Sequence, residues 1–372
     1  MKILFISHSF PPIVGGVENQ NFQLAEALKK SAQVRIIKNT RGKIWLPIFV
    51  PLTFLKAFFL MNRYDVCLLG SGVLAPLGSA ISFFHPKKKF FCVTHALDII
   101  FAEKKGWLSK IYKTVNIPSL EKMNKLFMVG NATIEEAVKL GISKKKCKFI
   151  PNGINKDDLK EKHLRKELSQ IFGKNIQDKK VILRLGRFVP HKGTSWFIEN
   201  VMPKLPENVV MIAAGGRVAK NTAGDKDDFL NSEKAIIKNK LENRVRLCPT
   251  IPQKDLKILL NTVDLVVSPN LKIPGSMEGF GINAIEAGVC ERIVFVSNIE
   301  GLLDAVKDGK NGKLIESGNE KAWVSEIKKI IKLKKKTLLK QGQEAGKYVE
   351  KNYSWNKISK KYLKEMNNTI SN

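Results

Sequence analysis

Short apolar runs alternate with longer mixed segments along the whole chain. The runs are roughly four to seven residues long, and the segments between them are long enough for helices. Strands of this length, separated by helices, are typical of parallel sheets that are covered on both faces. The pattern predicts strands at 2–7, 33–39, 64–70, 89–95, 125–130 and 146–152 in the first part of the chain, and at 181–186, 209–216, 244–250, 265–270, 292–298 and 312–316 in the second.

The length of the chain and one polar segment predict two domains. A chain of 372 residues exceeds one ordinary core and suits two domains of roughly 150–180 residues each. Residues 156–180 are polar and charged, so we place the junction there, between doubly wound α/β domains at 1–165 and 175–350. Ligands of such sheets bind beyond the carboxyl ends of the strands, and we expect the chemistry in a cleft between two such edges.

The composition is that of a globular protein with an excess of positive charge. Hydrophobic residues make up 44% of the chain, and the five cysteines are scattered, which indicates reduced thiols rather than a zinc site or a disulfide framework. The net charge is +30, and residues 1–150 hold 23 basic and 8 acidic residues, so the excess is denser in the first domain. This charge favours a nucleic acid, a nucleotide or an anionic membrane leaflet as partner, although a lysine-biased genome would give the same excess.

Two apolar segments bear on a membrane location. The run within residues 1–10 is about six residues long and ends at two prolines, so it predicts a strand rather than a secretion signal. The longest apolar segment, 44–61, is interrupted by two prolines and Lys56, whereas a spanning helix needs about 20 uninterrupted apolar residues, so we predict that it does not span. It is either a core helix followed by a loop, or an apolar surface that lies on an anionic leaflet with the lysine runs 86–89 and 144–146.

The predicted strand 181–186 continues into a loop that carries two cations. Arg187 and Lys192 lie in this loop, with Gly186 and Gly193 giving the backbone room, and a helical segment follows. A helix start offers free N–H groups and the positive end of the helix dipole, so two cations beside it suit a diphosphate. An ordinary turn would have the same sequence features.

The segment 276–288, SMEGFGINAIEAG, places two acids in a stretch that is otherwise free of charge. Glu278 is predicted in a loop and Glu286 in the second turn of a helix that begins near Gly281. Carboxylates are strong acceptors for vicinal hydroxyls, whereas the basic loop suits an anion. A ligand with a diphosphate between two sugars, namely a nucleotide sugar, satisfies both features.

Two main motifs and several supporting ones occur together in this chain. LGRFVPHKG (185–193) and MEGFGINAIEAG (277–288) are the main motifs, and PPIVGGVE (11–18), THALD (94–98), PNG (151–153) and GLLDAVKDGKNGKLI (301–315) are the supporting ones. In content and order they resemble the retaining, nucleotide-sugar-dependent glycosyltransferases of family 4, which have the GT-B fold. The resemblance implies two Rossmann-like domains that face a central cleft, with a last helix at about 353–372 packing back on the first domain.

The resemblance also implies roles for individual residues. Arg187 and Lys192 would bind the donor diphosphate and stabilise the leaving group, Glu278 would hold hydroxyls of the donor sugar, and Glu286 would hold the ribose. His95 would project toward the donor sugar and act in catalysis with Arg187, Lys192 and Glu278. The implied donor-binding residues are completed by Gly15, Gly16, Gly186, Gly279, Phe280 and Gly281.

Three further polar residues lie in the same motifs. We interpret His8 and His191 as structural, and Asp98 as a weaker candidate for contact with the substrate. Arg187, Lys192 and the helix dipole would supply the positive charge that a divalent cation supplies in other enzymes, so we expect no metal and no cofactor besides the donor substrate.

The expected activity is the transfer of a sugar, with retention, from a UDP- or GDP-linked donor to a glycan or lipid-linked acceptor in cell-surface polysaccharide or glycolipid assembly. We expect a cytoplasmic protein that lies peripherally on the inner face of the cytoplasmic membrane. One alternative is another enzyme of the same fold, either a phosphorylase or a soluble enzyme that makes a storage or protective sugar. The other is a non-enzymatic polyanion-binding protein, which the two glutamates and the missing nucleic-acid module disfavour.

Overall fold

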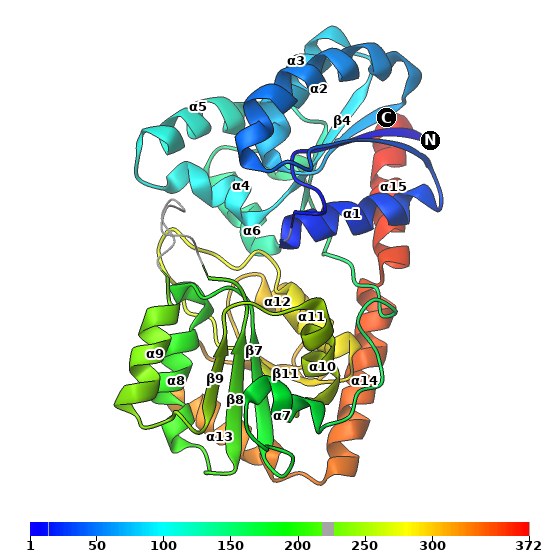
Figure 1. The fold of residues 1–372 in the computed structure, drawn as a ribbon. Helices are drawn as coiled ribbons and strands as arrows, with labels where there is room; N and C mark the ends of the chain where they lie inside the picture. Colours follow the sequence, from blue (N-terminus) through cyan, green and yellow to red (C-terminus); the bar gives the residue numbers. More distant parts are fainter. Residues whose placement is uncertain (14, 218–226, 372) are drawn as a thin grey trace. The chain divides into compact units, whose positions relative to one another are not determined.

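The computed structural model describes residues 1–13, 15–217 and 227–371, which form two compact units (Figure 1). The first unit contains residues 1–153 together with 353–372, and the second contains residues 154–352. Each unit has one six-stranded sheet in which every strand pair is parallel. All the predicted strands are present, so the predicted α/β architecture of two doubly wound domains is confirmed.

The N-terminal sheet has the strand order β2-β1-β3-β4-β5-β6. Because β1 pairs with both β2 and β3, the strand order reverses beside β1, and ligands of open α/β sheets bind at such a point. The register is in step across it, with Ile3 opposite both Val34 and Val66. The strands are β1 (Lys2–Ser7), β2 (Gln33–Lys38), β3 (Val66–Leu69), β4 (Lys89–Thr94), β5 (Lys125–Met128) and β6 (Cys147–Phe149).

Helices cover both faces of this sheet because side chains alternate along the strands. Ile3 and Phe5 of β1 join a buried cluster with α1 (Gly16–Lys29) and α15 (Trp355–Ser371). Leu4 and Ile6 point to the other face and join a separate cluster. That cluster is covered by α2 (Leu46–Leu60), α3 (Ala75–Phe84), α5 (Trp107–Glu121) and α6 (Asn131–Lys139), while the short α4 (Ala96–Ile100) follows β4.

The C-terminal sheet has the strand order β12-β11-β10-β7-β8-β9. Its strands are β7 (Lys180–Leu185), β8 (Val209–Ala214), β9 (Val245–Cys248), β10 (Leu265–Ser268), β11 (Ile293–Ser297) and β12 (Lys313–Ile315). One face packs on α8 (Thr194–Asn200), α9 (Phe229–Lys238) and α13 (Glu320–Ile331), where the rings of Phe197 and Trp323 meet edge to face at 5.7 Å. The remaining helices of this unit are α7 (Glu167–Phe172), α10 (Gln253–Thr262), α11 (Ile282–Val289), α12 (Leu302–Ala305) and α14 (Lys335–Tyr353).

The boundary between the two units lies earlier in the chain than we predicted. Residues 154–165, which we assigned to the first domain, belong to the C-terminal unit. The guanidinium of Arg165 donates to the carbonyl oxygens of Gln177 (3.2 Å) and Thr262 (3.0 Å) and pairs with Asp264 (2.8 Å). These bonds bind the segment to the start of β7 and β10. The chain returns to the N-terminal unit at the end of α14, and α15 packs against α1 on the far side from α2.

The apolar segment 44–61 forms the helix α2, preceded by a turn of 3₁₀ helix, η1 (Lys43–Trp45), and followed by another, η2 (Met61–Arg63). Only Phe49, Thr53 and Ala57 of α2 are buried. The segment is helical throughout, so the predicted loop is wrong. One side of the helix packs on the N-terminal core, as expected for a core helix, and the other side is exposed. Residues 43–63 are long and apolar enough to cross a membrane, but core helices pass the same test, so the prediction that they do not span stays a prediction.

Candidate functional site

The loops after β7 and β10 bring Lys192 and Glu278 into direct contact. Lys192 lies in the 3₁₀ turn η6 (Pro190–Lys192) after β7, and its ammonium group pairs with Oε2 of Glu278. Asn270, which follows β10, donates to the same oxygen at 2.9 Å. The sequence predicted these residues to hold different parts of one ligand. The structure shows that the predicted phosphate-binding lysine and the predicted sugar-binding glutamate form an ion pair with each other.

The surroundings of Glu278 keep its carboxyl group ionised. Burial alone would raise its pKa, but Lys192, His191 and the Asn270 amide favour the charged form, and the net effect is a lowered pKa. At neutral pH the group is therefore an acceptor, which suits the binding of sugar hydroxyls.

The backbone of Glu278 is held on both sides by the loop that follows β11. The Glu300 carboxylate accepts from the N–H of Glu278 at 2.6 Å, and the N–H of Gly301 donates to the Glu278 carbonyl oxygen at 3.1 Å. A Cβ atom on Gly301 would overlap the backbone of Gly279, which shows how closely the two loops pack. Burial raises the pKa of Glu300 to about 6. Sequence reasoning missed Glu300, although an acid directly before the supporting motif 301–315 was a signal.

The basic loop after β7 is shaped by a buried arginine that sequence reasoning also missed. Arg184 is 1% exposed and donates to the carbonyl oxygens of Gly186 and Arg187, the latter at 2.8 Å. Gly186 has a φ of 135°. Its carbonyl oxygen lies so close to Gly215 that a side chain at position 215 would not fit. The Arg187 side chain is exposed, so it is accessible to an anion. An arginine inside an apolar strand was the available signal for Arg184.

The start of α11 is fixed to the ends of two strands. Asn283 in its first turn donates to the carbonyl oxygen of Leu185 at 2.9 Å and to the Ser268 hydroxyl at 2.8 Å. Gly281, which precedes the helix, has a φ of 93°. Glu286, one turn further along, is half-buried, and burial raises its pKa to about 7. Among the described residues, no side chain forms a hydrogen bond with its carboxyl group.

The predicted donor residues of the C-terminal unit therefore lie at one edge of one sheet. Gly186, Arg187 and Lys192 follow β7, while Gly279, the buried Phe280 and Gly281 lead from β10 to α11. Parallel strands place their carboxyl ends together, which is why segments about 90 residues apart in sequence meet here. The role of each residue toward a ligand stays a prediction.

In the N-terminal unit, His95 follows β4 and caps the start of α4. Its backbone N–H donates to Asp98 Oδ2 at 2.9 Å, and its Nε2 atom is buried without a hydrogen-bond partner among the described residues. Burial lowers the pKa of His95 more than Asp98 raises it, so the imidazole is neutral at physiological pH. Asp98 also accepts from Ser71 (3.0 Å) and from the N–H of Gly72 (2.9 Å), so it positions His95 and the loop after β3, and its contact with a substrate stays a prediction.

Gly15 and Gly16 stand at the start of α1 and are exposed, while residue 14 lies outside the described residues. A Cβ atom on Gly15 would overlap the Glu18 carboxylate, which accepts from the Ser9 hydroxyl. His8, interpreted from the sequence as structural, shares the electrostatic environment of His95 and Asp98. Contact of Gly15, Gly16 or His95 with a donor stays a prediction.

The expectation of a metal-free site stays a prediction as well. In residues 1–13, 15–217 and 227–371, no group of three or more His, Cys, Asp or Glu side chains could hold a metal ion. The chain does contain an Asp-x-Asp sequence at 225–227. The Asp227 carboxylate pairs with Arg217 at 2.6 Å and accepts from the N–H of Phe229 at 3.0 Å, whereas residue 225 lies outside the described residues.

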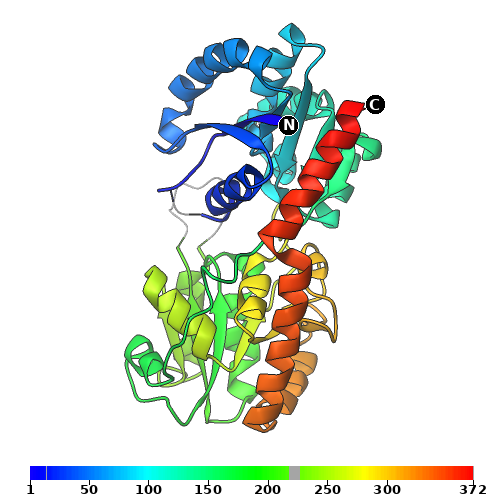
Figure 2. The ribbon, with the colours of Figure 1, turned by 90° about the vertical axis from the view of Figure 1, so that its right-hand side faces the viewer.

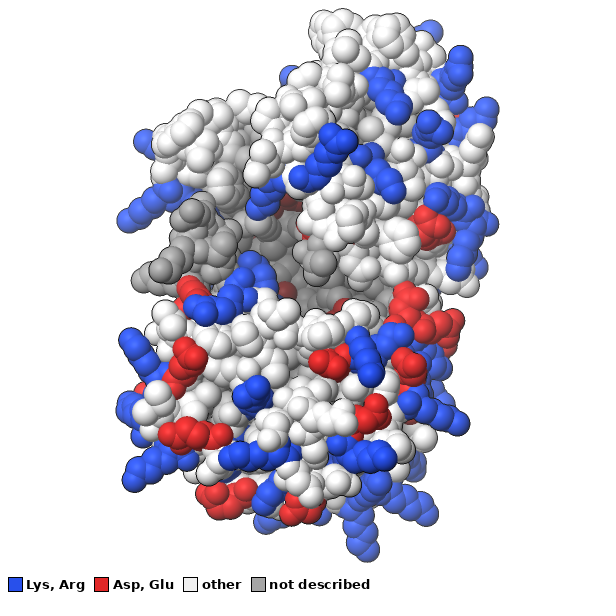
Figure 3. Space-filling model, viewed as in Figure 1, with Lys and Arg blue, Asp and Glu red and all other residues white. Residues whose placement is uncertain are grey.

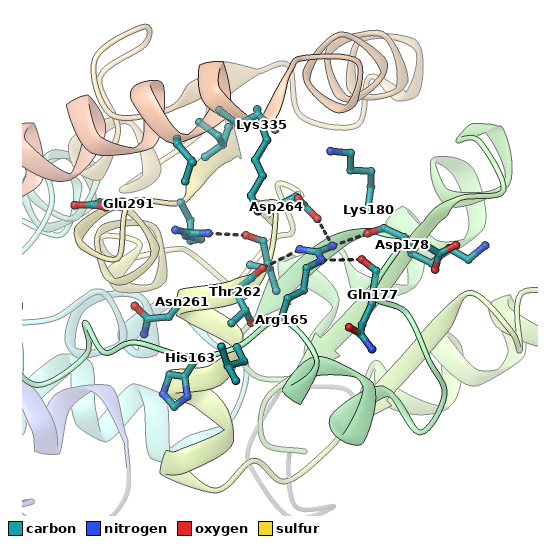
Figure 4. Close-up of a pocket in the computed structure, with 17 residues that line it drawn as sticks. His163, Arg165, Gln177, Asp178, Lys180, Asn261, Thr262, Asp264, Glu291 and Lys335 are labelled. Atoms are coloured by element: carbon teal, nitrogen blue, oxygen red, sulfur yellow. Dashed lines mark hydrogen bonds and ion pairs between the residues drawn. The ribbon is translucent and has the colours of Figure 1, made fainter.

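A pocket of about 470 Å³ lies elsewhere in the C-terminal unit, and Figure 4 shows its lining. Lys180, Asp264 and Ile293 line it, which places it at the amino ends of β7, β10 and β11, away from the predicted site residues. Arg165, which is in its lining, donates hydrogen bonds to Asp264 and to backbone carbonyl groups (Figure 4). We therefore interpret the pocket as part of the junction around residues 154–165 and not as the reaction site.

The family profile described as "Glycosyl transferases group 1" matches residues 165–351, which is half of the chain and includes the whole of the edge described above. The chain belongs to the glycosyl transferases group 1. Among its relatives is the N,N'-diacetylbacillosaminyl-diphospho-undecaprenol alpha-1,3-N-acetylgalactosaminyltransferase of Campylobacter jejuni, 27% identical over 272 residues. The match covers 71% of this chain and 65% of that relative, so the chain spans just under two thirds of its length.

Other relatives of this group 1 member have different acceptors in their names. The D-inositol 3-phosphate glycosyltransferase of Corynebacterium glutamicum is 25% identical over 197 residues, 52% of this chain and 44% of the relative. Among solved structures, Anabaena Alr3699/HepE in complex with UDP and glucose has a TM-score of 0.78 at 19% identity and covers 99% of this chain and 100% of its own. This likeness confirms the predicted GT-B fold; the assignment to family 4 stays a prediction.

Proposed function

We propose that this protein transfers a sugar from a UDP-linked donor to a lipid-linked acceptor, with retention of the anomeric configuration, at the cytoplasmic face of a membrane. The observation that carries the proposal is the pairing of Lys192 with an ionised Glu278 at the carboxyl edge of the C-terminal sheet. Support for the donor is the UDP named for the Anabaena structure, and support for the acceptor is the undecaprenol-linked substrate named for the Campylobacter relative. A role in cell-surface glycan or glycolipid assembly follows from that acceptor.

The proposed mechanism follows from where charge develops. Cleavage of the bond between the anomeric carbon and the phosphate oxygen leaves both electrons on the nucleoside diphosphate. Arg187 and Lys192 stabilise that negative charge, and the carbonyl bonds of Arg184 fix the loop that carries Arg187. The acceptor hydroxyl attacks the same face of the sugar and passes its proton to the departing phosphate oxygen, so the configuration is retained. We assign no protein nucleophile to this step.

The carboxylates orient the donor in this proposal. Glu278 accepts from hydroxyls of the donor sugar, and Glu286 accepts from the ribose hydroxyls when it is ionised. Because the pKa of Glu286 is about 7, the donor is expected to bind more tightly as the pH rises through neutrality. His95 in the N-terminal unit is the proposed neutral partner of the donor sugar.

The test uses the whole chain and needs no acceptor. UDP is expected to raise the melting temperature, and one sugar of a UDP-sugar panel is expected to be slowly hydrolysed. GDP-sugars and an oligonucleotide are included in the same screen. A response to oligonucleotides alone, or no response to any nucleotide sugar, would refute the proposal; hydrolysis of a GDP-sugar would correct the base and keep the reaction.

A further inference from the structure

The helix α2 carries a stripe of exposed apolar side chains. Ile48, Leu52, Leu55 and Phe59 recur at the spacing of one helix face, and the exposed fraction reaches 71% at Phe59. With 100° per residue, this stripe is turned about 130° from the buried residues of the same helix. Helices that are apolar on all sides are normally buried on all sides. Because α2 is buried on one side only, its other side is an exposed apolar surface.

The stripe continues onto the end of α3 through a group of phenylalanine rings. Phe58 of α2 lies 5.5 Å from Phe84 of α3, edge to face, and Phe59 and Phe83 flank this pair at 5.3 Å. Phe83 is 80% exposed and Phe84 is 55% exposed. The stripe and these rings form one continuous patch, which we name the α2–α3 face. Both ribbon views show α2 at the outer edge of the N-terminal unit (Figure 2).

The charges around the α2–α3 face are predominantly positive. Exposed cations on and beside α2 and α3 are Lys43, Lys56, Arg63 and Lys87. From 43 to 87 the sequence has one acid, Asp65, and its carboxylate accepts from the backbone N–H of Lys2 at 2.7 Å. Figure 3 shows the same imbalance over the N-terminal unit, at the top of the view, where blue and white predominate and red is sparse.

We propose that the α2–α3 face is a membrane-docking surface, on which α2 lies parallel to an anionic bilayer with Leu52, Leu55, Phe59 and Phe83 inserted at the level of the headgroups. Apolar side chains enter the boundary of the acyl chains, while the surrounding lysines pair with acidic lipids. A second copy of the chain fits the face less well, because it would bring the same cations against these. The inference deepens the proposed function, since a lipid-linked acceptor has to be reached at a membrane.

The same contacts argue against α2 as a spanning helix. Phe49, Thr53 and Ala57 are 7%, 2% and 0% exposed and belong to the face packed on the N-terminal core. A spanning helix would have to withdraw these side chains from that core. The opposite stripe, in contrast, reaches a bilayer without any change in the unit.

The experiment is co-sedimentation of the whole protein with vesicles of phosphatidylglycerol and phosphatidylcholine, in a salt series. Binding that needs phosphatidylglycerol and weakens with salt is expected for the wild type. The double variant Leu52→Glu and Phe59→Glu is expected to bind at least about tenfold more weakly, because each apolar side chain contributes and each new charge is repelled. Lys56→Ser is expected to weaken binding by about fivefold, and only where phosphatidylglycerol is present.

The matched control changes two exposed apolar residues of a helix in the other unit. Leu230 and Ile237 of α9 are 51% and 67% exposed and share one helix face, so Leu230→Glu with Ile237→Glu adds the same charges. The control is expected to bind vesicles like the wild type. Melting temperatures of both double variants, with and without UDP, show that each is folded and still binds the nucleotide.

Each other outcome overturns the inference in a distinct way. Equal vesicle binding by both double variants removes the α2–α3 face from the interaction. A dimer in free solution that the Leu52/Phe59 variant abolishes makes the face a contact between copies. Release by detergent but not by alkaline carbonate makes α2 a spanning helix. Failure of the proposed function shows separately, because UDP stabilisation and donor hydrolysis are measured without vesicles.

Discussion

Replacing Lys192 by alanine removes the cation that sits against Glu278, and two measurable losses follow. The first is kinetic: one stabiliser of developing charge is lost, so kcat for hydrolysis of the donor is expected to fall by about 10²–10³. The second is structural, because a buried carboxylate loses its partner. The two side chains are 15% and 11% exposed, so we expect a loss of about 3 kcal/mol of unfolding free energy at pH 7, the lower end for breaking a buried pair.

The pH dependence of the second loss gives it a signature. In the wild type the pKa of Glu278 lies below its unfolded value of 4.5, so the pair stabilises the fold above that pH and the stabilisation is lost as the pH falls. In the Lys192→Ala variant burial is expected to raise this pKa, so the stability of the variant falls as the pH rises above 4.5. The gap between the two proteins is therefore largest at neutral pH and narrows toward pH 4.5.

Urea unfolding from pH 4.5 to 8 and donor hydrolysis at pH 7.5 measure the two losses separately. The double variant Lys192→Met with Glu278→Gln, which has no buried charge at this contact, is expected to recover most of the stability and none of the activity. Wild-type hydrolysis by Lys192→Ala would refute the role of the cation. A gap in stability that does not change with pH would refute the pairing as the cause.

Three further predictions follow from the same edge of the C-terminal sheet. Arg187→Ala is expected to lower kcat by about 10²–10³, because its exposed side chain lies in the predicted phosphate-binding loop; steady-state kinetics measure the loss, and an unchanged kcat would contradict the role. Gly193→Ala is expected to destabilise by about 2–4 kcal/mol in urea unfolding, because φ is 66° there and a Cβ atom would overlap the Pro269 carbonyl oxygen. The pKa of Glu300 is raised to about 6, so its ionisation destabilises the fold. The Glu300→Gln variant is therefore expected to be more stable than the wild type above pH 6 and no more stable below pH 4.5. Equal pH profiles of the unfolding free energy would contradict this.

The fold was predictable because every strand is a compact apolar run. VILRLG at 181–186 and LVVSPN at 265–270 are examples, and both carry their functional loop at the carboxyl end. The domain boundary was less predictable, because the segment after 153 is polar. The unit to which it belongs is determined by hydrogen bonds to residues far away in the sequence. Arg165 reaches Asp264 across about 100 positions of sequence, and no local pattern contains that contact.

The sequence pattern also could not predict which side of α2 packs on the core. A helix that is apolar on every side gives no indication of which side meets the core, so a buried helix and a surface helix have the same pattern there. The structure resolves this because Phe49 and Ala57 pack on the sheet side, whereas Leu52 and Phe59 do not. We infer the contact of the exposed side from charge. Residues 43–87 contain a single acid among several cations, which favours an anionic surface.

The candidate site was predictable in its residues and not in its internal bonds. The motifs contain Lys192 and Glu278 but give no sign that they pair, since they lie on loops after different strands. Asn270, at the start of the same loop as Glu278, and Glu300, in the loop after β11, both bind Glu278, and neither stands out in its sequence segment. A motif records which groups a ligand meets, whereas the bonds that position those groups come from the packing of the loops.

The three carboxyl groups at this edge differ in protonation because, in the described part of the chain, Glu278 is the one that forms an ion pair with Lys192. Burial raises the pKa of Glu286 to about 7 and that of Glu300 to about 6, whereas Lys192 holds the pKa of Glu278 below its usual value. A diphosphate competes with Glu278 for the same ammonium group, since lysine has three donors but one compact charge. We infer that donor binding shares Lys192 between phosphate and carboxylate, and that the sugar hydroxyls then supply the hydrogen bonds that Glu278 gives up. A nucleotide without its sugar cannot complete that exchange, so UDP is expected to bind more weakly than the UDP-sugar when Glu278 is present and equally well in a Glu278→Gln variant; calorimetry of both ligands with both proteins decides.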